Sequence, residues 1–269
     1  MKKAAFLLIL SIVILVSGCG STTTPSSNPA DKTLKVGVTV GPHAQIMAVV
    51  QQVAEKNGLK IQIVEFADYI QPNVALSKGD IDLNSFQHQP YLEHVVADRK
   101  YDLIPLAKTV LFPMGVYSQK IRHLTELKAG ATVAIPDDPT NGGRSLLLLE
   151  KAGLVKLKHG AGLKASVRDI AENPRNITFK ELDAAHITRH LPEVDAAVIN
   201  SNFAMLAGLV PVASAIYLED ARSPYVNIIA IRAKDKDHPA YQKFLQSYHS
   251  DEVKAFIRDH FKSSIITTW

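Results

Sequence analysis

Apolar residues recur with a changing period along the chain, and the changes outline alternating strands and helices. Residues 34–40 (LKVGVTV) alternate and are rich in β-branched side chains, as expected of a strand. Pro42 suits the first position of a helix, and an apolar face then recurs at the helical period as far as Asn57 and Gly58. The rest of this half predicts a strand at 60–66, a helix at 70–79 and a strand at 80–86.

The same order of elements returns in the second half of the chain. It predicts a strand at 131–136, a helix at 141–154, a strand at 177–182, a helix at 183–193 and a strand at 194–200. Two βαβαβ units indicate an α/β protein of two lobes, each with a small, mainly parallel sheet flanked by helices. The polar residues 155–176 interrupt the second unit, and their structure is not predicted.

The remaining segments predict how the two lobes are connected. Residues 110–118 and 225–233 are expected to pass between the lobes, and helices within 238–247 and 251–261 are expected to pack back on the first lobe. We therefore assign residues 34–115 and 229–269 to lobe I and residues 116–228 to lobe II.

The N-terminus is a targeting segment rather than part of the fold. Lys2 and Lys3 precede an apolar run that ends in small residues before Cys19, the only cysteine of 269 residues. Residues 1–18 resemble a bacterial lipoprotein signal peptide, in which Cys19 would be lipidated and become the first mature residue. A plain signal peptide with a chance cysteine is the alternative. Residues 19–33 are rich in Ser, Thr and Pro and are expected to form a flexible tether.

Composition excludes several classes of function. The formal charge of +4 falls to +2 once Lys2 and Lys3 are removed, and no block of basic residues remains, so nucleic acid is not an expected partner. After residue 19 no segment is long and apolar enough to span a membrane. The chain contains no G-x-S-x-G elbow and no phosphate-binding glycine loop, so neither catalysis nor a cofactor is predicted. His186 and His190 have a spacing that can bind zinc, but we interpret them as a solvated helix face.

Polar side chains gather where the predicted strands end. Ligands of open parallel sheets bind outside the carboxyl ends of the strands, so these residues predict a ligand cleft between the lobes. One wall would be the stretch DLNSFQHQPYLE, and others would be the polar residues 137–144 and 200–203.

Within these walls, seven residues are expected to contact a ligand. Arg144, just inside a helix N-terminus, suits an anionic group, although a surface ion pair with Asp137 or Asp138 is the alternative. The amides of Asn202 and Asn227 suit a zwitterion. The remaining four would offer ring faces to an apolar or sulfur-bearing side chain, and they are Tyr69, Phe86, His88 and Tyr91.

Several segments, in one order, resemble a known family. They are DIDLNSFQHQPYLE, ATVAIPDDPTNGGRSLLLLEKAGL, VDAAVINSNFA and SPYVNIIA. From about Leu34 to the C-terminus the chain resembles the methionine-binding lipoproteins of bacterial methionine ABC importers, the NlpA lipoprotein family. The resemblance implies a two-lobed, type II-like periplasmic-binding-protein fold with methionine in the interlobe cleft. It also implies permease and ATPase subunits as partners, and attachment to a lipid bilayer in the cell envelope through acylated Cys19.

The resemblance also implies roles for individual residues. Arg144 would bind the methionine carboxylate, Asn202 and Asn227 the head group, and the four ring-bearing residues would surround the thioether. Relatives often have Thr at the position of Asn202, and some carry Gly-Ala-Glu-Gln where this chain has GPHAQ, which leaves the role of His43 open. The C-terminal KSSIITTW lacks the glycines common in the family. A receptor for another amino acid or a dipeptide, a metal-binding lipoprotein and a hydrolase are the alternatives.

Overall fold

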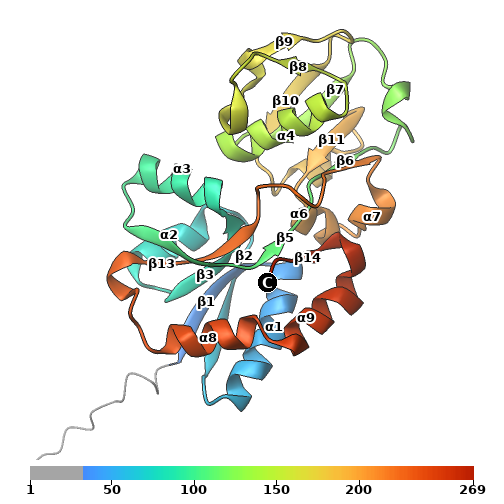
Figure 1. Cartoon of the computed structure of the whole chain (residues 1–269). Helices are drawn as coiled ribbons and strands as arrows, with labels where there is room; N and C mark the ends of the chain where they lie inside the picture. The colour runs from blue at the N-terminus through green and yellow to red at the C-terminus, as the bar shows by residue number, and fades with distance from the viewer. Residues whose placement is uncertain (1–32) are drawn as a thin grey trace, which may run out of the picture.

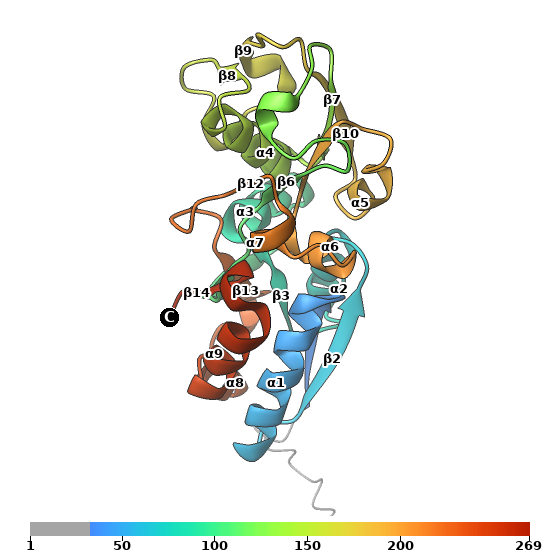
Figure 2. The same cartoon turned by 90° about the vertical axis from the view of Figure 1, so that its right-hand side faces the viewer.

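The computed structural model describes residues 33–269 of the chain. The predicted signal peptide, Cys19 and the predicted tether up to residue 32 lie outside the described residues. The ribbon forms two lobes, one above the other in Figure 1, and the same separation is visible from the side in Figure 2. The two-lobed α/β fold that the sequence predicts is therefore confirmed.

Lobe I is built on a five-stranded sheet of order β2-β1-β3-β13-β4. Its first part comprises β1 (Leu34–Thr39), α1 (Pro42–Lys56), β2 (Ile61–Phe66), α2 (Gln71–Lys78), β3 (Leu83–His88), α3 (Gln89–Arg99) and β4 (Leu103–Lys108). The first five of these elements coincide with the predicted ones to within three residues at each end. Pro42 and Gly79 act as expected, since the former opens α1 and the latter ends α2 with a left-handed φ of 87°.

Lobe II is built on a second five-stranded sheet, of order β10-β7-β11-β6-β12. Its strands and α-helices are β6 (Gly115–Tyr117), β7 (Thr132–Pro136), α4 (Pro139–Lys151), β8 (Lys156–Leu157), β9 (Ile170–Glu172), β10 (Thr178–Leu182), α5 (Ile187–His190), β11 (Ala196–Ile199), α6 (Ser201–Leu206), α7 (Pro211–Ser214) and β12 (Tyr217–Leu218). Single 3₁₀ turns are η2 (Leu124–Glu126), η3 (Gly162–Lys164) and η4 (Val167–Asp169). The polar insertion thus folds into the β8–β9 pair and two of these turns.

The C-terminal part of the chain returns to lobe I. It comprises β13 (Asn227–Arg232), η5 (Ala233–Asp235), α8 (Ala240–Tyr248), α9 (Asp251–Phe256), the π-helical η6 (Ile257–Phe261), η7 (Lys262–Ser264) and β14 (Ile266–Thr267), which pairs with β5 (Val110–Leu111). Side chains of α8 and α9, among them Phe244 and Val253, share one apolar core with β1 and α1. The predicted packing of both C-terminal helices on lobe I is confirmed.

Each sheet is mixed, with two parallel and two antiparallel pairs. In lobe I, β1 runs parallel to β2 and β3, whereas β13 runs antiparallel to β3 and β4. In lobe II, β7 runs parallel to β10 and β11, whereas β6 runs antiparallel to β11 and β12. The parallel pairs come from the βαβαβ units, and the antiparallel strands come from the segments where the chain changes lobe. The chain passes between the sheets after Leu111 and again between Leu218 and Asn227, while the assigned lobe boundaries stay a prediction.

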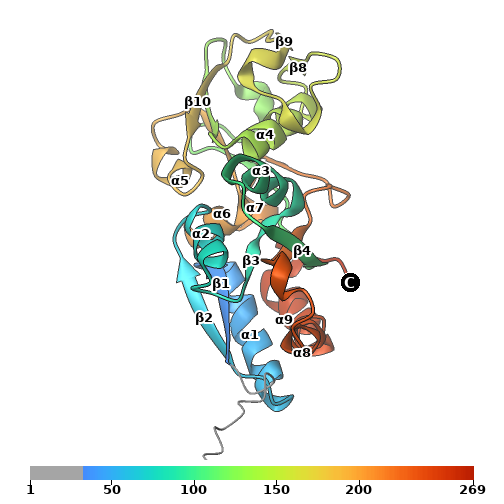
Figure 3. The ribbon, with the colours of Figure 1, turned by 90° about the vertical axis from the view of Figure 1, so that its left-hand side faces the viewer.

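Helices cover both faces of each sheet. In lobe I, α1, α8 and α9 pack on one face, and α2 and α3 pack on the other (Figure 3). In lobe II, α4 covers one face, and α5 and α6 cover the other. The predicted helix 183–193 is wrong in extent, because only Ile187–His190 are helical. The carboxylate and the carbonyl of Asp183 accept hydrogen bonds from the N–H groups of Ala185 and His186, and these bonds form a turn instead.

Candidate functional site

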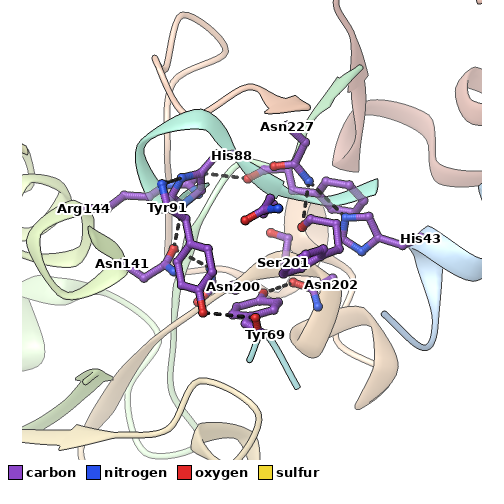
Figure 4. Close-up of a pocket in the computed structure, with 13 residues that line it drawn as sticks. His43, Tyr69, His88, Tyr91, Asn141, Arg144, Asn200, Ser201, Asn202 and Asn227 are labelled. Atoms are coloured by element: carbon purple, nitrogen blue, oxygen red, sulfur yellow. Dashed lines mark hydrogen bonds between the residues drawn. The ribbon is translucent and has the colours of Figure 1, made fainter. Parts of the chain in front are cut away.

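A pocket lies between the two lobes, and about 350 Å³ of space free of protein atoms, part of it open to solvent, is associated with it. The carboxyl ends of β3, β7 and β11 all lead into it, and the start of β13 joins them because β13 runs antiparallel to β3, with Asn227 opposite His88. Figure 4 shows side chains from both lobes converging on this space. The lining residues are His43, Tyr69, Phe86, Gln87, His88, Tyr91, Phe112, Asn141, Arg144, Asn200, Ser201, Asn202 and Asn227.

All seven residues predicted to contact a ligand line this one pocket. They come from five separate parts of the chain, namely the segment after β2, the junction of β3 and α3, α4, α6 and β13. The structure therefore brings them together, while the contact each makes with a ligand stays a prediction.

Arg144 is buried, with 4% of its side chain exposed, and its ion-pair partner is Glu219. Its Nε donates to Glu219 Oε1 at 3.0 Å, while Nη2 donates to Glu219 Oε2 and to the Phe112 carbonyl. The alternative of a surface pair with Asp137 or Asp138 is thus wrong. Nη1 makes no hydrogen bond to residues 33–269, which leaves its donors for a ligand.

The expected anion site at the start of α4 needs correction. The helix begins at Pro139, so Arg144 lies in its second turn, and Asp138 already caps the first turn by accepting from the N–H groups of Thr140 and Asn141. The glycines serve packing, because a Cβ at Gly143 would lie 2.7 Å from the Leu163 carbonyl oxygen. The guanidinium, not the helix N-terminus, is therefore the cationic group of the pocket.

His88 connects α3 to the opposite lobe through its two ring nitrogens. Its Nδ1 accepts from the N–H of Tyr91 at 3.1 Å and so caps α3, which requires the ring proton on Nε2. Nε2 then donates to Asn141 Oδ1 at 3.1 Å in lobe II. Burial, with the nearby Arg144 charge, lowers the pKa of His88 to about 3, so the ring is neutral.

Aromatic side chains form one end of the pocket. The ring centroid of Tyr69 lies 5.8 Å from that of Phe86, 6.0 Å from that of Tyr91 and 4.8 Å from that of Phe203. The Tyr69 hydroxyl donates to Asn202 Oδ1, and the Tyr91 hydroxyl donates to the main-chain carbonyl of Tyr69. Burial raises the pKa of both phenols above the usual value, so this end of the pocket is uncharged.

Another part of the pocket contains a chain of three polar side chains, which come from β1, α1 and β13. Nδ2 of Asn227 donates to Nε2 of His43 at 3.0 Å, and Nδ1 of His43 lies 2.8 Å from Oγ1 of Thr39. Burial lowers the pKa of His43 to about 3, and its ring packs 4.4 Å from that of Phe112. Asn227 Oδ1 makes no hydrogen bond to any described residue.

Two polar residues of the stretch 82–93 have a structural role beside the pocket, and one of them, Gln87, also lines it. Asn84 and Gln87 of β3 form a closed amide network with Asn73 of α2. Asn84 Nδ2 and Gln87 Nε2 both donate to Asn73 Oδ1, at 2.9 and 2.8 Å, and Asn73 Nδ2 donates back to Gln87 Oε1 at 2.8 Å. All three side chains are buried, so the network satisfies polar groups that would otherwise be costly in the core.

Several lining residues were absent from the predicted set. Asn141, Asn200 and Ser201 belong to the polar strand ends that the sequence singles out, so their pattern offered a signal. The sequence leaves the role of His43 open. Phe112 and Glu219, the partner of Arg144, lie in the segments between the lobes, where no hydrophobic period marks them. The hydroxyl of Ser201 donates to the Pro113 carbonyl.

Residues 33–269 contain neither a candidate metal-binding cluster nor a helix that could span a membrane. No group of three or more His, Cys, Asp or Glu side chains is placed to hold a metal ion there. His186 is exposed, and His190 pairs through Nδ1 with Glu193 at 2.8 Å. Within the same residues, no helix has the length and hydropathy needed to cross a bilayer.

Two α/β lobes with a polar and aromatic pocket enclosed between them define a two-lobed substrate-binding protein. The model of the NlpA lipoprotein family matches residues 34–269, nearly the whole described chain. The chain belongs to this family, and the resemblance drawn from its sequence is confirmed.

Similar proteins occur in other bacteria. The chain is 46% identical over 259 residues to the D-methionine-binding lipoprotein MetQ of Salmonella typhimurium, covering 95% of this chain and 94% of that protein. It is 47% identical over 239 residues to the Escherichia coli protein of the same name, covering 88% of each. A nutrient-binding protein from Burkholderia cenocepacia, solved bound to methionine, is 50% identical with a TM-score of 0.87, covering 88% of this chain and all of that one.

Proposed function

We propose that this chain is the receptor subunit of an ABC importer, which captures methionine between its lobes and delivers it to a membrane permease and its ATPase. The observation that carries the proposal is one interlobe pocket with cationic, amide and aromatic walls. Relatives named for methionine binding, and the Burkholderia structure bound to methionine, support the same ligand.

The pocket offers a partner to each part of methionine. The Nη1 donors of Arg144 would bind the carboxylate, and Oδ1 of Asn227 would accept from the ammonium. Rings of Tyr69, Phe86 and Tyr91 would surround the thioether, because sulfur contacts aromatic edges favourably.

Two further amide atoms of the pocket wall favour a zwitterionic ligand. Nδ2 of Asn202 is a buried donor and Oδ1 of Asn200 is a buried acceptor, and neither has a hydrogen-bond partner among residues 33–269. Each unmade bond costs about 1–3 kcal/mol, so a ligand that supplies both partners would recover that energy. A carboxylate and an ammonium supply one acceptor group and one donor group.

No covalent step forms part of this function. Both pocket histidines are neutral with one ring nitrogen committed as an acceptor to a protein donor, and the Ser201 hydroxyl donates to a main-chain carbonyl rather than to a base. Binding energy would instead favour the closed arrangement of the lobes, which the permease distinguishes from the open one. Cys19, once acylated, would hold the receptor at a membrane of the cell envelope.

Calorimetric titration of a form that begins after Cys19 tests the proposal. The protein is unfolded and refolded to remove any retained ligand, then titrated with L-methionine, D-methionine, other amino acids and methionine-containing dipeptides. We expect one-to-one binding of methionine that weakens in Arg144→Ala and Asn227→Ala. Binding of a different ligand in place of methionine would support the receptor role but contradict methionine as the ligand. No binding across the panel would contradict the proposal.

A further inference from the structure

We infer that His43 is a positioning residue for ligand recognition, because its imidazole holds the Asn227 amide with Oδ1 turned toward the ligand ammonium. This role rests on the proposed function, in which Asn227 contacts the ammonium group. His43 reaches the pocket from the first turn of α1, and Asn227 comes from the start of β13, 184 positions later in the chain.

The orientation of the Asn227 amide follows from its two contacts inside lobe I. One atom of the Asn227 amide lies 3.3 Å from the main-chain oxygen of Phe86. Because this oxygen can only accept a hydrogen bond, the amide atom that faces it must be Nδ2. The same Nδ2 lies 3.0 Å from Nε2 of His43 (Figure 4). Oδ1 therefore lies on the other side of the amide, where no described residue donates to it.

The amide orientation determines which nitrogen of His43 carries the proton. Nε2 accepts from Asn227, so the proton of the neutral ring lies on Nδ1, which donates to the Thr39 hydroxyl at 2.8 Å. The side chain of Thr39 is completely buried and 4% of His43 is exposed, so water does not compete for either bond. Thr39, His43 and Asn227 thus form one directed chain of hydrogen bonds.

The neutral state of His43 is part of this arrangement. Burial lowers the pKa of His43 to about 3, and no carboxylate within residues 33–269 is hydrogen-bonded to its ring. A ring protonated on Nε2 would face the Asn227 NH₂ with a second donor. The amide would then favour the reverse orientation and present NH₂ instead of oxygen to the ligand.

His43 therefore contributes to the preference of the pocket for ligands that carry an amino group over ligands that lack one. Without it, only the 3.3 Å contact with Phe86 would hold Nδ2 in place. An amide free to reverse would lose the acceptor for an ammonium, yet a ligand without an amino group would be little affected.

Titration of the full-length chain in detergent with two ligands tests this role. The ligands are L-methionine and 4-(methylthio)butanoate, which lacks the amino group. We expect His43→Leu to lose about tenfold in affinity for methionine and little for the second ligand. His43→Gln, whose carbonyl can accept from Asn227 Nδ2, should recover most of the loss. Met47→Leu, a buried change one turn further along α1, should match the unaltered chain.

The outcomes separate this role from the proposed function. If His43→Leu lost affinity for both ligands equally, or for neither, His43 would not position Asn227. If the unaltered chain bound no methionine, the proposed function would fail first. The proton position is measured independently of both, by the ¹⁵N signals of the imidazole in the unaltered ligand-free protein, where we expect Nδ1–H. A proton on Nε2 would overturn the inference even if the variants did not fold.

Discussion

The hydroxyl of Tyr69 donates a 2.5 Å hydrogen bond to Oδ1 of Asn202, and the two residues belong to different lobes. A second bond between the lobes joins His88 Nε2 to Asn141 Oδ1 at 3.1 Å. The ring of Tyr69 also packs into the apolar core of lobe II. These contacts hold the lobes closed around the pocket, and opening must break both bonds.

Removal of the Tyr69 hydroxyl should weaken methionine binding. Tyr69→Phe keeps the ring contacts but loses the bond to Asn202, which exists only when the lobes are closed. Because the closed form is the one that binds, a loss of about 1 kcal/mol lowers affinity roughly fivefold. Calorimetric titration measures the change, and Tyr217→Phe is the control, since its hydroxyl makes no hydrogen bond within residues 33–269. Equal affinities in Tyr69→Phe and the unaltered chain would show that the bond does not assist closure.

The Arg144–Glu219 pair should contribute strongly to stability. Glu219 also accepts hydrogen bonds from the Met114 N–H and the Ser223 hydroxyl, and only 11% of its side chain is exposed. Glu219→Gln preserves the shape but leaves Arg144 buried without its counter-charge, so we expect a loss of about 3 kcal/mol in the free energy of unfolding. Urea denaturation measures it. Glu193→Gln, which removes an exposed carboxylate, should cause no measurable change.

The convergence of the seven pocket residues was predictable because the carboxyl ends of neighbouring parallel strands meet at one edge of a sheet. Local sequence signals also sufficed to predict most helices and strands. The start of α4 was predictable too, because Asp138 followed by Pro139 is a typical N-cap and first helical residue. The partner of Arg144 was not predictable, since Glu219 lies in an irregular segment 75 residues away. The contact of His43 with Asn227 likewise depends on how β13 enters the lobe I sheet.

The buried amide network behind the pocket should also be essential to lobe I. Asn73→Leu is similar in size, but it deprives Gln87 Oε1 of its donor and Asn84 Nδ2 of its shorter partner. We expect a loss of about 2 kcal/mol in unfolding free energy, measured by urea denaturation. Gln89→Leu changes an exposed amide two residues after Gln87 and should leave the free energy of unfolding unaltered. A tolerated Asn73→Leu would mean that water enters the core to replace the lost bonds.

The two neutral pocket histidines should make stability depend on pH in the acid range. His43 and His88 each have a folded-state pKa of about 3, against about 6.5 in an unfolded chain. As pH falls from 6.5 toward 3, the unfolded chain takes up protons that the folded protein does not, so the free energy of unfolding decreases. Each histidine contributes at most about 1.4 kcal/mol per pH unit in this window and nothing above it.

Urea denaturation at a series of pH values measures this slope. His43→Gln and His88→Gln should each flatten the curve between pH 6.5 and 3, and the double variant should flatten it further. Met47→Leu, which removes no titrating group, should shift the whole curve without altering its slope. If both histidine variants kept the slope of the unaltered chain, the two rings would titrate in the folded protein as they do in the unfolded one. The hydrogen bonds from Asn227 to His43 and from the Tyr91 N–H to His88 would then not persist in acid, because each requires a ring nitrogen that carries no proton.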